Sequence, residues 1–216
     1  MKFLTLLPPL LLGATALIAA QPRTLRDFRG TQPPPATLHD ATLVLIDAQR
    51  EYDSGQLPLA GVDAAIAEAA ALLQRARAAG TPIVHIVQHS PGALFDPAGP
   101  FVAIVAPLTP RPGETVIVKT LPNSFAGTTL DQTLRKLGRK NIILAGFMTH
   151  MCVDATAHAA LDLSYQTTVV AAACATRDIP DGRGGIVPAE VVQRAHLAGL
   201  ADRFASVVAT QVQIPD

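Results

Sequence analysis

The sequence lacks the features of a nucleic-acid binder, a disordered tail or a disulfide-stabilised scaffold. Its 216 residues carry 17 basic and 17 acidic side chains, so the formal net charge is zero and we expect no nucleic-acid partner. No run of like charges forms an interaction tail, and 49% of the residues are hydrophobic, which is too many for a disordered chain. Two cysteines are too few for a disulfide framework. The length instead suits one domain with a hydrophobic core.

The first twenty residues differ from the rest of the chain. Met1 and Lys2 form a short basic start, residues 3–18 carry no charge, and Ala19 and Ala20 are small. This layout predicts a signal peptide over residues 1–20 and a secreted or periplasmic protein. A retained membrane anchor is the alternative, because the apolar run is nearly long enough to span a bilayer. No second run of that length follows, so we expect residues 21–216 to form one domain without membrane association once the leader is removed.

Apolar runs and helical patterns alternate along the rest of the chain. A continuous apolar run, typical of a strand buried on both faces, occupies residues 43–46, and further strands are predicted at residues 83–87, 116–118, 142–145, 167–172 and 206–209. Helical patterns lie between them, at residues 62–76, 128–137, 151–163 and 188–200. Such strand–helix units predict a three-layer α/β/α sandwich with a mostly parallel, Rossmann-like sheet of about six strands. Residues 90–113, rich in proline and glycine, are expected to be a long irregular connection.

Three reactive side chains stand where predicted strands end, namely Asp47, Lys119 and, just beyond the fourth strand, Cys152. Ligands of open parallel sheets collect at the carboxyl ends of the strands. A thiol at the start of a helix and beside an ammonium group is expected to have a lowered pKa, and a carboxylate can exchange its proton. Together the three would form an activated nucleophile with an acid–base partner. Each alone also has a structural interpretation, as a packed cysteine, a solvated lysine or a helix-capping aspartate.

Three stretches of sequence carry a family resemblance. They read LIDAQ at residues 45–49 (followed by Tyr52), VKTLPNSFAGT at residues 118–128, and GFMTHMCV at residues 146–153. In this order, the stretches resemble those of the isochorismatase-like cysteine hydrolases, which include nicotinamidases and N-carbamoylsarcosine amidases. Within this superfamily the chain looks closest to the streptothricin-hydrolase-like group, on residues 146–152 and 175–178.

The resemblance implies roles for the residues that match. Asp47 would be the general base, Lys119 the cation beside the thiol and Cys152 the nucleophile. The resemblance also implies a cis peptide bond between Phe147 and Met148. The backbone N–H groups of Met148 and Cys152 would then form the oxyanion hole.

Four further residues are candidates for substrate contact, namely Gln49, Tyr52, Phe125 and His150. Bracing of the site is the alternative for Gln49 and Tyr52, and core packing is the alternative for Phe125. No metal or other cofactor is expected, because the histidine pattern of the metal-binding nicotinamidases is incomplete after the second predicted strand. His85 lies inside that strand and is interpreted as a packed core residue.

The resemblance therefore predicts a metal-independent cysteine hydrolase. It would cleave an amide, lactam or ureide C–N bond of a small molecule through a thioester intermediate. Hydrolysis of a vinyl ether, as by isochorismatase, is one alternative, and a catalytically silent secreted binding protein on the same scaffold is another. A nucleotide-binding enzyme is disfavoured because the chain has no glycine-rich phosphate loop. Membership of this family also implies a homo-oligomer.

Overall fold

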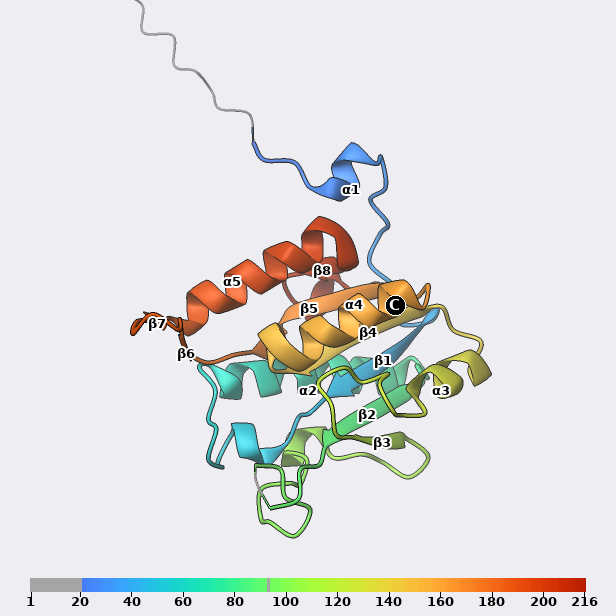
Figure 1. Cartoon of the computed structure of the whole chain (residues 1–216). Coiled ribbons are helices and arrows are strands. Elements are labelled where there is room, and N and C mark those ends of the chain that lie inside the picture. Colours follow the sequence, from blue (N-terminus) through green and yellow to red (C-terminus); the bar gives the residue numbers. More distant parts are fainter. Residues whose placement is uncertain (1–20, 93) are drawn as a thin grey trace, which may run out of the picture.

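The sheet at the centre of the molecule has the topology that the sequence predicts. The structure is a computed structural model that describes residues 21–92 and 94–216, and the predicted signal peptide lies outside this part of the chain (Figure 1). Within it, six strands form one parallel sheet in the order β3-β2-β1-β4-β5-β8. The strands are β1 (Ala41–Ile46), β2 (Ile83–Gln88), β3 (Thr115–Lys119), β4 (Asn141–Phe147), β5 (Gln166–Ala175) and β8 (Ser206–Val208).

Helices cover both faces of this sheet and complete the three predicted layers. The helix α2 (Val62–Ala78) lies on one face, whereas α3 (Leu130–Lys136) and α4 (Asp154–Asp162) lie on the other (Figure 1). The helix α5 (Ala189–Gly199) leads into β8, and a short helix α1 (Leu25–Phe28) lies in the N-terminal segment. None of the helices among the described residues combines the length and the apolar character needed to cross a bilayer.

Alternating side chains of the strands build two cores. In β1, Leu43 and Leu45 pack in the cluster that contains α2, whereas Val44 and Ile46 pack in the cluster that contains α3 and α4. All four side chains are buried, which explains why the strand reads as a continuous apolar run rather than an alternating one.

Two local features differ from the prediction. The predicted helix at 151–163 begins as a π-helical turn, Thr149–Val153, and only then continues as α4. Between β5 and α5 the chain forms a small antiparallel hairpin of β6 (Ile179–Pro180) and β7 (Ile186–Val187), whose short strands carry no clear sequence pattern.

Candidate active site

Three reactive side chains meet at the carboxyl ends of the strands. Asp47 directly follows β1, Lys119 is the last residue of β3, and Cys152 lies in the π-helical turn after β4. The Lys119 Nζ atom lies 2.7 Å from Asp47 Oδ2 and 3.4 Å from Cys152 Sγ. The structure therefore brings together the three residues that the sequence singled out.

The lysine reaches the aspartate across the end of an intervening strand. Because β2 lies between β1 and β3, the long side chain of Lys119 must pass the end of β2 to approach Asp47. There its ammonium group also donates to Gln88 Oε1, at 2.7 Å. Gln88, the last residue of β2, thus fixes the position of the cation between the carboxylate and the thiol.

Burial controls the electrostatics of this group. Asp47, Lys119 and Cys152 are 0%, 1% and 4% exposed. Burial raises the pKa of Asp47, and the neighbouring Lys119 opposes that rise. Burial, and then the charge of Asp47, raise the pKa of Cys152 to about 12. The expected lowering of the thiol pKa is therefore wrong, because desolvation and the carboxylate outweigh the ammonium group.

Two backbone positions allow this arrangement. Asp47 has a φ of 49°, in the left-handed region that aspartate tolerates better than most residues. Gly146, near the end of β4, has a φ of 126°, and a Cβ atom there would lie 2.0 Å from the Ile46 carbonyl oxygen. Only glycine permits this close approach of β4 to β1, which sets the start of the turn that carries Cys152.

The turn after β4 contains the cis peptide bond that the resemblance implies, between Phe147 and Met148. The carbonyl oxygen of Met148 accepts hydrogen bonds from the backbone N–H groups of Met151, at 3.1 Å, and Val153, at 3.2 Å. These two bonds fix the backbone on either side of the nucleophile candidate.

A pocket of about 400 Å³ opens next to Cys152. Its walls are mostly apolar, and Arg177 adds a guanidinium group to them. The Nη1 atom of Arg177 donates to the carbonyl oxygen of Asp178, at 3.0 Å, but its buried Nε has no hydrogen-bond partner among the described residues. The lining residues are Tyr52, Leu57, Gln88, Ser90, Leu94, Phe95, Pro122, Met148, Met151, Cys152 and Arg177.

Comparison with known proteins assigns this fold and site to a family. Residues 41–212 match the Isochorismatase domain model. The chain belongs to the isochorismatase family. The resemblance carried by the three sequence stretches is thus confirmed, and the family is one of hydrolases.

Individual family members match over most of the chain. The secreted isochorismatase effector Isc1 of Verticillium dahliae is 38% identical over 190 residues, which are 87% of this chain and 97% of that protein. Streptothricin hydrolase of Streptomyces noursei is 35% identical over 163 residues, 74% of this chain and 65% of its own length. The crystal structure of an isochorismatase from Pseudomonas putida KT2440 has a TM-score of 0.86 and 42% sequence identity, covering 89% of this chain and 99% of that one.

Of the first two predicted substrate-contacting residues of this isochorismatase-family protein, Tyr52 lines the pocket and Gln49 does not. Tyr52 lines it and packs edge-on against Phe95, with ring centroids 5.0 Å apart. Gln49 is fully buried, and its Nε2 donates to the carbonyl oxygens of Gln88, at 3.0 Å, and Val102, at 2.7 Å. Because both ends of its amide bind backbone groups, Gln49 braces the site rather than facing this pocket.

The other two candidates are directed elsewhere. Phe125 stacks on Tyr165, with ring centroids 5.7 Å apart, and packs against the core on the α3–α4 side of the sheet. The Nδ1 atom of His150 contacts the Thr176 hydroxyl, and its ring lies 5.8 Å from that of His196. Neither residue is among those that line the pocket.

Sequence reasoning missed Gln88 and Arg177. Gln88 ends β2, and Arg177 follows the end of β5, so both stand at strand ends like the residues that were identified. Gln88 directly follows the predicted strand at 83–87, so the strand-end pattern indicates it, whereas Arg177 lies five residues beyond the predicted end of the strand at 167–172, because β5 extends to Ala175.

The sequence predicts that His85 packs in the core and that no metal is bound. His85 is 1% exposed, and its Nε2 lies 2.9 Å from Glu114 Oε2, so it is a packed residue as expected. Across residues 21–92 and 94–216, no group of three or more His, Cys, Asp or Glu side chains is arranged to hold a metal ion.

Proposed function

We propose that this isochorismatase-family protein is a cysteine hydrolase that cleaves an amide, lactam or ureide C–N bond of a small molecule. The observation that carries the proposal is the position of Lys119 Nζ, 2.7 Å from Asp47 Oδ2 and 3.4 Å from Cys152 Sγ, next to a pocket. A buried carboxylate, cation and thiol in contact supply a base, a charge partner and a nucleophile. The name of the streptothricin hydrolase relative is consistent with hydrolytic chemistry at this site.

The reaction begins with transfer of the Cys152 proton to Asp47. Because the pKa of Cys152 is raised to about 12, the resting thiol is protonated, and deprotonation accompanies attack on the carbonyl carbon. The Oδ1 atom of Asp47 is buried and has no hydrogen-bond partner among the described residues, so it is free to accept this proton. Lys119 then stabilises the thiolate through its 3.4 Å contact with Sγ.

Collapse of the tetrahedral intermediate releases the amine and leaves a thioester. The backbone N–H groups of Met148 and Cys152 would stabilise the oxyanion, and Asp47 would return its proton to the departing nitrogen. Water, deprotonated by the same carboxylate, then attacks the thioester, and the thiol regains a proton. No step requires a cofactor.

The pocket walls indicate the kind of substrate. A volume of about 400 Å³ and mostly apolar walls suit a small organic molecule. The guanidinium group of Arg177, which belongs to these walls, would donate to a substrate oxygen.

Replacement of the two cysteines tests the proposal. Both Cys152→Ala and the control Cys174→Ala remove a buried thiol, but Cys174 does not line the pocket. Release of ammonia or amine from small amides, ureides, lactams and nicotinamide is the measurement. We expect Cys152→Ala to abolish it and Cys174→Ala to retain it. Unchanged turnover by Cys152→Ala would refute the mechanism.

Mass spectrometry of the quenched enzyme separates amide cleavage from vinyl-ether hydrolysis. An amide substrate adds its acyl group to the peptide that contains Cys152, because the thioester is covalent. Vinyl-ether hydrolysis leaves no such acyl adduct, and a silent binding protein shows neither adduct nor turnover.

We also propose that the protein is exported. The relative Isc1 is named a secreted effector, and the layout of residues 1–20 supports the same route. N-terminal sequencing of the protein from the medium or the periplasm is expected to begin at Gln21. A full-length chain retained in the cell would contradict export.

A further inference from the structure

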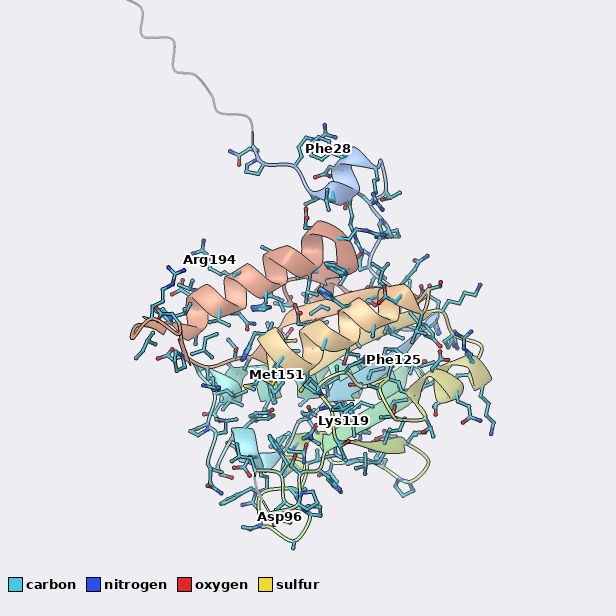
Figure 2. The ribbon with its side chains drawn as sticks, in the orientation of Figure 1. Phe28, Asp96, Lys119, Phe125, Met151 and Arg194 are labelled. Atoms are coloured by element: carbon cyan, nitrogen blue, oxygen red, sulfur yellow. The ribbon has the colours of Figure 1, made fainter. Side chains whose placement is uncertain are left out.

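A second cavity, of about 540 Å³, lies at the other end of the sheet. It is bounded by the amino ends of β4, β5 and β8 and by the N-terminal segment, residues 26–36. In Figure 2, Phe28 of this segment lies far from Lys119 and Met151, which mark the proposed active site. The cavity is therefore separate from the Cys152 pocket, and the proposed hydrolysis makes no use of it.

Three arginines line this second cavity, namely Arg26, Arg29 and Arg203. Arg26 is 8% exposed, yet its Nε donates to the carbonyl oxygen of Arg203, at 3.3 Å, and its Nη1 donates to Ser206 Oγ, at 3.2 Å. Both acceptors are neutral. Among the described residues none of the three arginines forms an ion pair with a carboxylate, and residues 1–20 contain no acidic side chain.

The acidic residues of the neighbouring segments are engaged elsewhere. Asp27 Oδ2 accepts hydrogen bonds from the backbone N–H and the hydroxyl of Thr24, both at 2.8 Å, and Asp27 Oδ1 accepts from Gln32 at 2.6 Å. Asp202 Oδ1 accepts from the backbone N–H of Leu25, at 2.8 Å. Neither aspartate lines the cavity, so the positive charge there has no carboxylate counterion within residues 21–92 and 94–216. Burial and the charge of Arg203 accordingly lower the pKa of Arg26.

Neutral polar residues also border this space. Thr167, near the start of β5, lines the cavity and is 4% exposed, but its Oγ1 has no hydrogen-bond partner among the described residues. The amides of Asn141 and Gln166 add further polar groups to the same wall.

We propose that this cavity binds a small molecule carrying a doubly charged oxyanion, of which a phosphate monoester is the simplest class. Guanidinium groups match the oxygens of such an anion in charge and in geometry, and the anion would supply the counterion that Arg26 lacks. The volume exceeds that of a bare ion, so the amides of Asn141 and Gln166 are available to the rest of the molecule. The ligand would lie between the N-terminal segment and the sheet, and its binding would hold the two together.

Calorimetric titration and thermal unfolding at constant ionic strength test the proposal. The probes are inorganic phosphate, glycerol 3-phosphate and, as the neutral match, glycerol. We expect both phosphates to bind and to raise Tm, and glycerol to do neither. Arg26→Gln and Arg203→Gln are expected to weaken phosphate binding about tenfold or more.

Controls separate loss of the site from loss of the fold. Because Arg26 is buried, Arg29→Gln serves as a second variant at an exposed position, and it should also weaken binding without lowering Tm in the absence of phosphate. Arg194→Gln, an exposed arginine on α5 outside the cavity, should bind as the wild type does. Cys152→Ala should also bind phosphate normally, which keeps this result independent of the proposed hydrolysis.

Several outcomes would overturn the proposal. One is the absence of phosphate binding by the folded wild-type protein at millimolar concentration. Another is equal binding by the wild type and all three arginine variants. If ultracentrifugation showed that wild-type chains associate, that the arginine variants do not, and that phosphate has no effect, the arginines would pair with a second copy and the anion site would be excluded.

Discussion

The two ends of the sheet differ in whether a buried positive charge has a carboxylate partner. At the carboxyl ends, Lys119 lies 2.7 Å from Asp47, so the cation is neutralised within the protein. At the amino ends, Arg26 is less deeply buried, 8% exposed against 1% for Lys119, and its hydrogen-bond partners among the described residues are all neutral. Because an uncompensated buried charge is costly, the difference indicates what each end accommodates. The carboxyl end, where the cation has a carboxylate partner (the balanced end), suits a neutral group that reacts. The amino end, where the cation has none among the described residues (the unbalanced end), suits an anion that binds.

The largest effect is expected from removing the negative charge at the balanced end. Asp47→Asn should lower kcat/KM about 10²- to 10⁴-fold, because the proposed acid–base group is lost. The same change should speed alkylation of Cys152 by iodoacetamide at pH 8, since the charge of Asp47 helps to hold the pKa of that thiol at about 12. Amine release and peptide mass spectrometry measure the two effects.

A matched variant controls for the change of charge. Asp162→Asn removes an exposed carboxylate at the end of α4 and should alter neither rate. Retention of full activity by Asp47→Asn would remove the aspartate from the mechanism.

Replacement of each cation by methionine tests the comparison directly. Lys119→Met leaves Asp47 buried without its partner and should lower the free energy of unfolding by about 3–5 kcal/mol. Arg26→Met removes a charge that has no carboxylate partner, so it should change that free energy by no more than about 1–2 kcal/mol in phosphate-free buffer. Urea unfolding measures both changes. Equal losses of unfolding free energy would show that Arg26 is compensated to the same degree as Lys119.

Sequence patterns predicted the parts of this molecule that depend on local order along the chain. The strand β1 was evident because Leu43, Val44, Leu45 and Ile46 are all apolar, and the end of that strand led to Asp47. The thiol pKa was predicted in the wrong direction because it depends on how completely the fold removes water from Cys152, which the local sequence does not record.

Contacts between distant segments account for the other differences. Phe125 faces the core because Tyr165, 40 positions along the chain, stacks on it. Arg26 and Arg203 come together only when the N-terminal segment packs beside the end of α5 and β8 (Figure 1). Neither pairing leaves a motif in either segment, so a single sequence does not reveal it.

A smaller effect is expected at the wall of the Cys152 pocket. Arg177→Gln should raise KM about tenfold with a smaller change in kcat, because a donor to bound substrate is lost while Asp47, Lys119 and Cys152 remain. Steady-state kinetics on a substrate identified in the amide panel give the two constants. Arg183→Gln, an exposed change in the β6–β7 hairpin, is the control. A lower kcat at unchanged KM would instead place Arg177 in the chemical step.

The smallest effect concerns pH and a third buried group. Burial lowers the pKa of His85, so the unfolded chain takes up its proton first as the pH falls below about 6.5. The free energy of unfolding should therefore decline between about pH 6.5 and pH 5, and His85→Gln should make that decline shallower. Glu114, whose pKa lies at about 2, stays ionised throughout this range.

Urea unfolding at pH 7, 6 and 5 measures this decline. His150, whose pKa is also lowered by burial, remains in the variant, so the slope should decrease without disappearing. The exposed His39→Gln serves as the control. An identical slope in the wild type and His85→Gln would show that His85 does not contribute.

Strand ends and a connecting loop contribute different residues to the Cys152 pocket, and this has a consequence for how such proteins diversify. The proposed catalytic residues stand at the ends of β1, β3 and β4, whereas Ser90, Leu94 and Phe95 belong to the irregular connection after β2. Mutations in that connection can reshape what enters the pocket while the reactive trio stays in place. A library randomised at those three positions is therefore a direct route to variants with new substrate preferences, and natural drift in the same stretch would let one chemistry serve many metabolites.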